Sequence, residues 1–207
     1  MSDRGIFLGG MAAGALVLAA SVAFTIPGLV PARAEEPAVD GPGPNLVLEV
    51  GGSVTGRIVI DLQPDLASKH VERLEALAAE GAYNDVVFHR VIDGFMAQTG
   101  DVQFGKRGGD MRMAGMGGSA LPDLPAEFSD VPFRRGTVGM ARAQDPNSAN
   151  SQFFIMFAPG DFLNGQYTVV GQVVQGMDVV DAIKKGDANQ NGTVADPDYI
   201  VTATVEK

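Results

Sequence analysis

Short segments in which apolar and polar side chains alternate recur along the chain from residue 46 almost to its end. Alternation with a period of two is the pattern of a β-strand that buries one face. Eight such segments predict a mainly β protein, and a closed antiparallel barrel is the arrangement that leaves no strand edge open. The predicted strands are residues 46–50, 56–62, 86–91, 95–99, 137–141, 152–157, 167–173 and 200–205.

Two segments interrupt the alternation with a helical period. Residues 64–80 place apolar side chains, including Leu74, on one stripe, and Gly81 follows as a glycine C-cap. Residues 178–185 repeat the pattern over a shorter length, with lysines near the end. We expect both helices to cap the barrel, with His70 on the outer surface of the first.

The N-terminus has a different composition. Residues 6–30 are apolar or small and carry no charge, which is typical of an export signal or a membrane anchor. Alanines at positions 32 and 34 fit the small-x-small cleavage rule, so residues 1–34 are predicted to be a signal peptide, with an uncleaved anchor as the alternative. Residues 35–44 contain three prolines and predict a linker before a folded domain at residues 45–207. Cleavage would give a periplasmic or secreted protein, whereas an anchor would hold it at the membrane, facing the periplasm.

Composition removes several kinds of chemistry. The formal net charge of -10, the pI near 4.5 and the lack of a basic run argue against binding to nucleic acid. Without cysteine there is no thiolate nucleophile and no cysteine zinc site, and two histidines make a histidine metal site unexpected. Residues 187–198 copy part of a calcium-binding EF-hand loop but lack its bidentate Glu and contain Pro197, which favours a polar turn. We therefore expect no metal and no cofactor.

The first candidate site lies in residues 88–101, FHRVIDGFMAQTGD. Two alternating stretches flank an Asp-Gly turn signal, so a period of two puts Arg90 on the face of Phe88 and Met96 on the face of Gln98. Such a hairpin could set a polar pair over an apolar surface. Alternatively, the apolar residues could fill a core while the polar pair lies in water.

Two further blocks follow in the second half of the chain. Residues 151–157, SQFFIMF, place Gln152 and Phe154 on one face of a strand, with large side chains on both faces. Residues 162–171, FLNGQYTVVG, are a turn with an Asn-Gly signal that leads into the next strand. Together the three blocks resemble the FHR...GFM.Q.GD, SQFFI and (W/F)L(D/N)G...V.G elements of the cyclophilin family of peptidyl-prolyl cis/trans isomerases.

The resemblance covers about residues 46–205 and implies an eight-stranded cyclophilin-like barrel with two capping helices and a site on its outer wall. It implies that proline-containing unfolded or nascent polypeptides are the partners and that Arg90 is catalytic. The side chains expected to contact substrate are those of Phe95, Met96, Gln98, Ala141, Arg142, Gln152, Phe154, Phe162, Leu163 and Tyr167.

The chain departs from the family pattern at three of these positions. Arg142 stands where the family often has Asn, Phe162 where it often has Trp, and Tyr167 where many members have His. These departures leave a non-catalytic proline-peptide-binding chaperone module of the same fold as the alternative function. A lipocalin-like barrel with an internal ligand cavity is the alternative fold, although the aromatic residues of 152–157 favour a filled interior.

Overall fold

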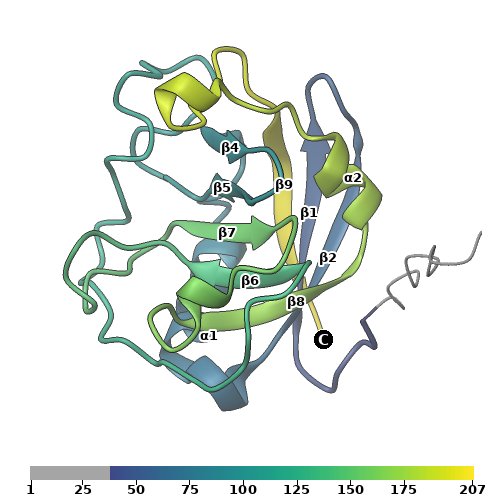
Figure 1. Cartoon of the computed structure of the whole chain (residues 1–207), viewed down its shortest axis with the longest axis vertical. Coiled ribbons are helices and arrows are strands. Elements are labelled where there is room, and N and C mark those ends of the chain that lie inside the picture. Colours follow the sequence, from purple (N-terminus) through teal and green to yellow (C-terminus); the bar gives the residue numbers. More distant parts are fainter. Residues whose placement is uncertain (1–37) are drawn as a thin grey trace, which may run out of the picture. The chain divides into compact units, whose positions relative to one another are not determined.

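The computed structural model describes residues 38–207, so the predicted signal peptide or anchor lies outside the described residues. One nine-stranded antiparallel sheet dominates this part of the chain, in the order β3-β9-β1-β2-β8-β6-β7-β5-β4 (Figure 1). The mainly β prediction is confirmed. The strands are β1 (Asn45–Gly51), β2 (Gly56–Leu62), β3 (Val86–Val87), β4 (Arg90–Ile92), β5 (Met96–Thr99), β6 (Thr137–Met140), β7 (Phe153–Met156), β8 (Val169–Gln175) and β9 (Tyr199–Glu206).

The prediction of eight strands is wrong by one because the expected strand at residues 86–91 is broken in two. β3 and β4 are separated by Phe88 and His89, and these two strands are the two ends of the sheet order. The end strands of the curled sheet, β3 and β4, are therefore consecutive along the chain, and no β-ladder joins them directly. The peptide groups at the break bond to the C-terminal region instead, with Phe88 N–H donating to Asp198 O (2.8 Å) and Val194 N–H to His89 O (3.1 Å).

The break also changes which side chains face inward. Phe88 and Val91 both lie in the main core, although they are three residues apart, because an extra residue in a strand shifts the alternation by one. The prediction that Arg90 shares a face with Phe88 is therefore wrong. Arg90 lies half-buried on the outer side of the sheet, and this placement makes an outer site possible.

Apolar side chains pack on both faces of the sheet. Inside the curl, a large cluster includes Leu48, Ile60 and Phe153, and it fills the interior, which excludes the lipocalin-like alternative with its internal cavity. On the outer face of β5, β6 and β7 lies a second, smaller cluster with Met96, Phe154 and others. Adjacent residues of β7 thus serve different clusters.

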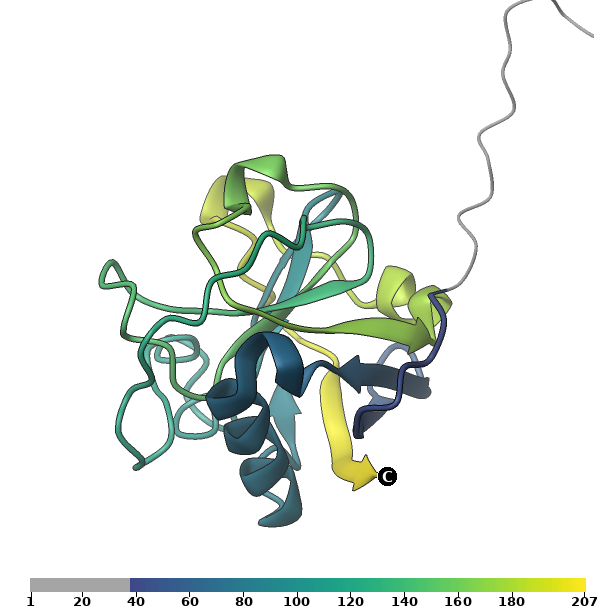
Figure 2. The ribbon, with the colours of Figure 1, turned by 90° about the horizontal axis from the view of Figure 1, so that it is seen from below.

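The two α-helices of the described residues lie apart, with α1 against β9, β8 and β1 and α2 against β2 (Figures 1 and 2). Helix α1 (Pro64–Ala79) buries Val71, Leu74 and Leu77 in the main core, and Gly81 follows with a left-handed φ of 69°, as expected of a glycine after a helix end. Helix α2 (Met177–Ala182) ends earlier than predicted. Its C-cap Ile183 is extended and buried, and the Lys185 ammonium bonds the carbonyls of Asp181 and Ile183.

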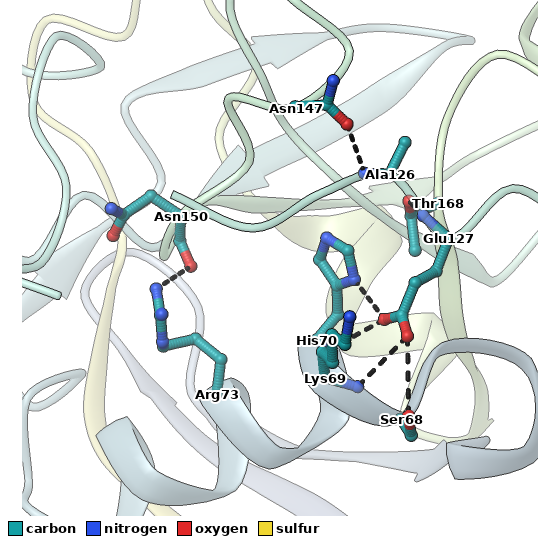
Figure 3. A network of polar contacts seen from close by, with 9 residues as sticks. All are labelled: Ser68, Lys69, His70, Arg73, Ala126, Glu127, Asn147, Asn150 and Thr168. Atoms are coloured by element: carbon teal, nitrogen blue, oxygen red, sulfur yellow. Dashed lines mark hydrogen bonds and ion pairs between the residues drawn. The ribbon is translucent and has the colours of Figure 1, made fainter. Parts of the chain in front are cut away.

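His70 is buried, contrary to its predicted place on the helix surface. Helix α1 is broken at Ala67 (φ -151°, ψ 67°), and the break exposes N–H groups within the helix. The Glu127 carboxylate binds there, accepting from Lys69 N–H (3.4 Å), His70 N–H (3.2 Å) and His70 Nδ1 (2.6 Å) (Figure 3). Glu127 therefore caps the second part of α1 from a distant loop and compensates for burying the histidine.

The same residue ties the loop to the start of β8. The backbone N–H of Glu127 donates to Thr168 Oγ1 at 3.1 Å, next to the predicted site residue Tyr167 (Figure 3). Burial lowers the pKa of His70 while Glu127 raises it, with a net decrease. For Glu127, burial raises the pKa, but hydrogen bonds from His70 and the helix outweigh this effect.

Residues 38–44, the described part of the predicted linker, run along β1 and β2. The Pro44 carbonyl accepts from Leu62 N–H (2.9 Å), and Asn45 Nδ2 donates to Asp40 Oδ1 (3.2 Å). None of the helices between residues 38 and 207 is long and apolar enough to cross a bilayer. The division into signal, linker and domain stays a prediction.

Candidate functional site

The candidate site is built on one row of residues across the outer face of four strands. Pairing in register places Arg90 of β4 opposite Gln98 of β5, Gln98 opposite Phe154 of β7, and Phe154 opposite Gly139 of β6. Because side chains directly opposite one another lie on the same face, this register brings the predicted Arg, Gln and Phe together. A Cβ at Gly139 would lie 2.7 Å from the Phe154 ring, so Gly139 leaves space for it.

The Arg90 guanidinium is held on two sides. Its Nη1 donates to Gln98 Oε1 (3.2 Å), while Nε donates to the backbone oxygen of Asn191 and Nη2 to Asn191 Oδ1, both at 3.0 Å. Three of its five N–H groups thus have oxygen acceptors, and Nη1 also donates to Met96 Sδ (3.8 Å), which fixes the plane of the guanidinium and leaves the second N–H of Nη2 for a ligand. Burial lowers the pKa of Arg90, and the effect of Tyr167 opposes this shift.

Asn191 is the main site residue that sequence reasoning missed. It follows the short helix η2 (Ala188–Gln190) and adopts a left-handed conformation with φ 55° and ψ 32°. Asp187 organises this turn by accepting from Asn189 N–H at 2.8 Å. The segment weighed above as a calcium loop therefore holds the arginine, and no group of three or more His, Cys, Asp or Glu side chains in residues 38–207 could hold a metal ion.

A chain of hydrogen bonds supports Arg90 from the other side. Gln98 Nε2 donates to Gln152 Oε1 (3.0 Å), and Gln152 Nε2 donates to the carbonyls of Gly115 (3.0 Å) and Gly117 (2.8 Å). The backbone N–H groups of Gly115 and Gly117 donate in turn to Asp101 Oδ2, at 2.8 and 3.0 Å respectively.

Asp101 is fully buried, and its other oxygen accepts from Gln103 and Phe104 N–H. The Asp101 carboxylate thus holds the loop at Gly115 and Gly117, and this loop in turn positions Gln152 and Gln98. Sequence reasoning gave it no role, although it closes the first motif block.

An apolar cavity of about 270 Å³ opens beside the guanidinium. Phe154 forms its floor between the rings of Phe133 and Tyr167, with centroids 5.8 and 5.9 Å away. Phe162 stands at the rim, 66% exposed and 5.4 Å from the ring of Phe95. The cavity can accept a compact apolar ring, and it is lined by Arg90, Phe95, Met96, Gln98, Ala141, Arg142, Phe154, Phe162, Leu163 and Tyr167.

These lining residues are all of the predicted site residues except Gln152. Gln152 lies in an adjacent, more polar cavity of about 400 Å³ that also contains Ser119, Asp123 and Asn150. Gln98, Ala141 and Arg142 line both cavities. A peptide that places one residue in the apolar cavity could therefore place a neighbouring residue in the polar one.

Arg142 lies between the cavities and over the Tyr167 ring, with Cζ 4.5 Å from the ring centroid. Its Nη1 donates to the carbonyls of Ala143 (2.9 Å) and Gln144 (3.2 Å), and Nη2 donates to that of Gln166 (3.0 Å). This guanidinium stacks on an aromatic face, an arrangement that stabilises a cation by about 0.5–2 kcal/mol.

His89 is buried under the loop that contains Gly115 and does not line the apolar cavity. A Cβ at Gly115 would lie 3.0 Å from its Nε2, and neither ring nitrogen makes a well-formed hydrogen bond with the described residues. Burial lowers the pKa of His89 to about 4, against the opposing effect of Asp101. The ring is therefore neutral but only weakly basic at pH 7, and it does not line the apolar cavity, so a role as a general base in the site is not favoured.

Comparisons with known proteins agree with this arrangement. The profile of the family described as cyclophilin type peptidyl-prolyl cis-trans isomerase/CLD matches residues 46–205. A probable peptidyl-prolyl cis-trans isomerase of Brucella suis is 57% identical over 194 residues, covering 93% of this chain and 95% of the relative. Peptidyl-prolyl cis-trans isomerase B of Escherichia coli is 38% identical over 145 residues, covering 66% and 84% respectively.

Solved structures show the same fold. A cyclophilin from Hirschia baltica has a TM-score of 0.64 at 25% identity and covers 80% of this chain and 74% of its own. A cyclophilin-type isomerase of Cryptosporidium parvum, crystallised with the dipeptide Ala-Pro, has a TM-score of 0.66 at 24% identity and covers 79% and 99%.

Fold and site thus define a curled β-sheet protein with two adjoining cavities on its outer wall. The chain belongs to the cyclophilin-type peptidyl-prolyl cis-trans isomerase family. The predictions of this family and of an isomerase are confirmed at that level.

Proposed function

We propose that this protein accelerates the cis/trans isomerisation of X-Pro bonds in unfolded polypeptides, with Arg90 as the catalytic group. The observation that carries the proposal is a guanidinium fixed by Gln98 and Asn191 at the edge of an apolar cavity. Proline offers that cavity a compact ring without an N–H donor, which suits walls made of Phe, Met and Tyr.

The barrier to rotation about an X-Pro bond is about 18–20 kcal/mol because the amide has partial double-bond character. Shortening a time of tens of seconds to milliseconds requires about a 10⁴-fold acceleration, or about 5.5 kcal/mol. No covalent step is needed. When the bond is twisted, the proline nitrogen becomes pyramidal and gains a lone pair that a planar amide lacks. A free N–H of Arg90 would bond this lone pair and so stabilise the transition state selectively.

Gln98 has two functions in this proposal. Its Oε1 accepts from Arg90 and its Nε2 donates to Gln152, so it orients the guanidinium. The second N–H of Nε2 would bind the carbonyl next to the rotating bond. The apolar residues would meanwhile hold the proline ring while the other side of the bond turns.

We further propose that the protein acts outside the cytoplasm, on exported polypeptides, after cleavage behind Ala34. Support for this part comes from the uncharged segment at residues 6–30 and the small residues that precede Glu35. Proline isomerisation is slow enough to limit folding wherever chains emerge unfolded, so an exported isomerase would serve envelope and secreted proteins.

Exchange NMR on one proline peptide tests the catalytic part. Arg90→Ala should lower kcat/KM by about 10²- to 10³-fold, the scale for loss of one preorganised transition-state donor. Arg90→Lys should recover only a small part because it lacks the planar fork. Arg57→Ala, which removes a surface pair with Glu206, is the matched control and should stay active.

Thermal melts would show that each variant is folded. A folded Arg90→Ala variant with most of its activity would contradict the mechanism. A wild-type protein that binds the peptide without increasing exchange would instead indicate a non-catalytic binding module.

A further inference from the structure

Arg142 is a site arginine to which the proposed function gives no role. The protein has a formal net charge of -10, and Arg57, Arg112, Arg134 and Arg135 all pair with carboxylates. Arg142 has no carboxylate partner among residues 38–207, and its contacts are three neutral carbonyls and the Tyr167 ring. Its positive charge is therefore not neutralised within the described part of the chain.

The guanidinium is also incompletely bonded. Nε is shielded from solvent without an acceptor, and only one of the two N–H groups of Nη2 has an acceptor. The second N–H of Nη2 thus remains for an incoming acceptor, whereas the shielded Nε is out of reach of one.

The position of Arg142 indicates which residue of a bound peptide could reach it. Arg142 lines both the apolar cavity and the polar one, together with Gln98 and Ala141. A side chain that meets Arg142 would therefore belong to a residue close to the proline in the bound peptide. The stacking on Tyr167 and the three carbonyls hold the cation in place, so binding would not have to immobilise a free arginine.

We propose that Arg142 selects peptides that carry Asp or Glu within two residues of the isomerising proline. The inference rests on the proposed function and adds a substrate class to it. The carboxylate would lie at the boundary of the two cavities and accept the free Nη2 N–H of Arg142, with the charge attraction that makes arginine a common partner of carboxylates.

A carboxylate already present in the polar cavity makes the prediction sharper. Asp123 lines this cavity, where its Oδ1 accepts from Asn150 Nδ2 at 2.8 Å. If Asp123 governed selection, basic side chains would be preferred. The sign of the preference therefore distinguishes the two residues, and Asp123→Asn should increase the preference for acidic peptides or leave it as it is.

The test compares proline peptides that carry Glu with matched peptides that carry Gln, which has the same shape without the charge. The substitution is made in turn at four positions, two before the proline and two after it. We expect about 5- to 20-fold higher kcat/KM for Glu at one position, with the difference mainly in KM, because the interaction is charge-assisted but partly exposed. Arg142→Gln should bring the Glu/Gln ratio close to one, Arg142→Lys should keep part of it, and added salt should reduce it.

Arg107→Gln is the matched control, because Arg107 also stacks on a tyrosine, Tyr199, and has no carboxylate partner within residues 38–207, but it lies outside both cavities. It should not change the ratio. Equal rates for Glu and Gln at all four positions, a ratio that survives Arg142→Gln, or a preference for Lys would overturn the inference.

The same peptides titrated by NMR give a ratio of dissociation constants that does not depend on catalysis. If no peptide shows faster exchange, the proposed isomerase function fails. The Glu/Gln ratio of Kd then still decides the role of Arg142.

Discussion

Asn191 illustrates a residue whose importance is visible only after folding. It lies 101 positions from Arg90 in sequence, yet both its backbone oxygen and its Oδ1 accept from that guanidinium. Its φ of 55° is tolerated by Asn and Gly and strained for most other residues. The backbone conformation and the side-chain acceptor thus explain asparagine at this position.

We predict that Asn191→Gly lowers kcat/KM by about 10- to 150-fold, as expected for one hydrogen bond to a charged group. The backbone acceptor would remain, and Gly fits the left-handed turn, so the melting temperature should change little. Isomerisation rates and thermal melts check both parts. Asn189→Gly, in the same turn but without contact to Arg90, is the control, and an Asn191→Gly variant as active as this control would show that Asn191 only forms the turn.

For single residues, the period-two pattern predicted which side chains face the cavity wherever the strands are regular. Met96, Gln98 and Phe154 lie as alternation predicts. It failed for Phe88 because the strand breaks there, and the sequence carries no clear signal for that break. Asn191 could not be found because loop residues have no periodicity.

At the break between β3 and β4, a buried histidine makes the stability of the fold depend on pH. His89 lies in this break with a pKa lowered by burial from its ordinary value of 6.5 to about 4. The unfolded chain therefore binds a proton between these values while the folded protein does not, so stability is complete above pH 6.5 and falls as the pH decreases toward 4. The loss amounts to about 3 kcal/mol.

Denaturant unfolding of His89→Gln at pH 7 and pH 4.5 tests this effect. The variant should lose less stability on acidification than the wild type, while some dependence remains because the pKa of buried His70 is lowered as well. Isomerisation at pH 7 should persist in the folded variant, since His89 does not line the apolar cavity. Identical pH dependence in variant and wild type would contradict the assignment.

The β1–β2 pair carries a second buried titratable group. Asp61 is 4% exposed and lies opposite Asn45 in the register, and Oδ1 of each has no hydrogen-bond partner in the part of the chain that the structure describes. Burial, and then the charge of Asp40, raises the pKa of Asp61. The folded state thus favours the protonated acid, and this contribution to stability is lost as the pH rises through the folded-state pKa.

Asp61→Asn mimics the protonated acid and could donate to Asn45. We expect it to stabilise the protein at pH 7 by about 1 kcal/mol, and to give no gain below pH 3.8, where the wild-type acid is protonated as well. Thermal melts at pH 7 and pH 3 measure the difference. A variant that is less stable at pH 7 would show that the ionised carboxylate has a partner.

The strands and helices could be predicted because each type has its own sequence period. Where a helix ends and which of its side chains are buried depends instead on residues far away in the sequence. Helix α2 stops at Ala182 because Ile183 turns extended into the core. His70 was misplaced because the Glu127 carboxylate that permits its burial lies 57 residues further along the chain. Neither interaction leaves a local pattern.

For the whole molecule, the N-terminus gives a direct prediction. If the chain is cleaved behind Ala34, it loses Asp3, Arg4 and Arg33, and its formal net charge changes from -10 to -11. N-terminal sequencing of the native protein should then begin at Glu35, in a fraction that needs no detergent. Intact Met1 in a detergent-requiring membrane fraction would indicate an anchor.

The sheet order has a consequence for how the chain acquires its fold. The first strand, β1, pairs on one side with β9, which ends one residue before the C-terminus, and β9 also pairs with β3. Contacts between the two ends of a chain form late, because a long loop must close before they contribute. The edges of β1 and β3 that pair with β9 therefore stay unpaired until β9 has been synthesised. An isomerase with this topology would itself spend its first moments as an unfolded polypeptide.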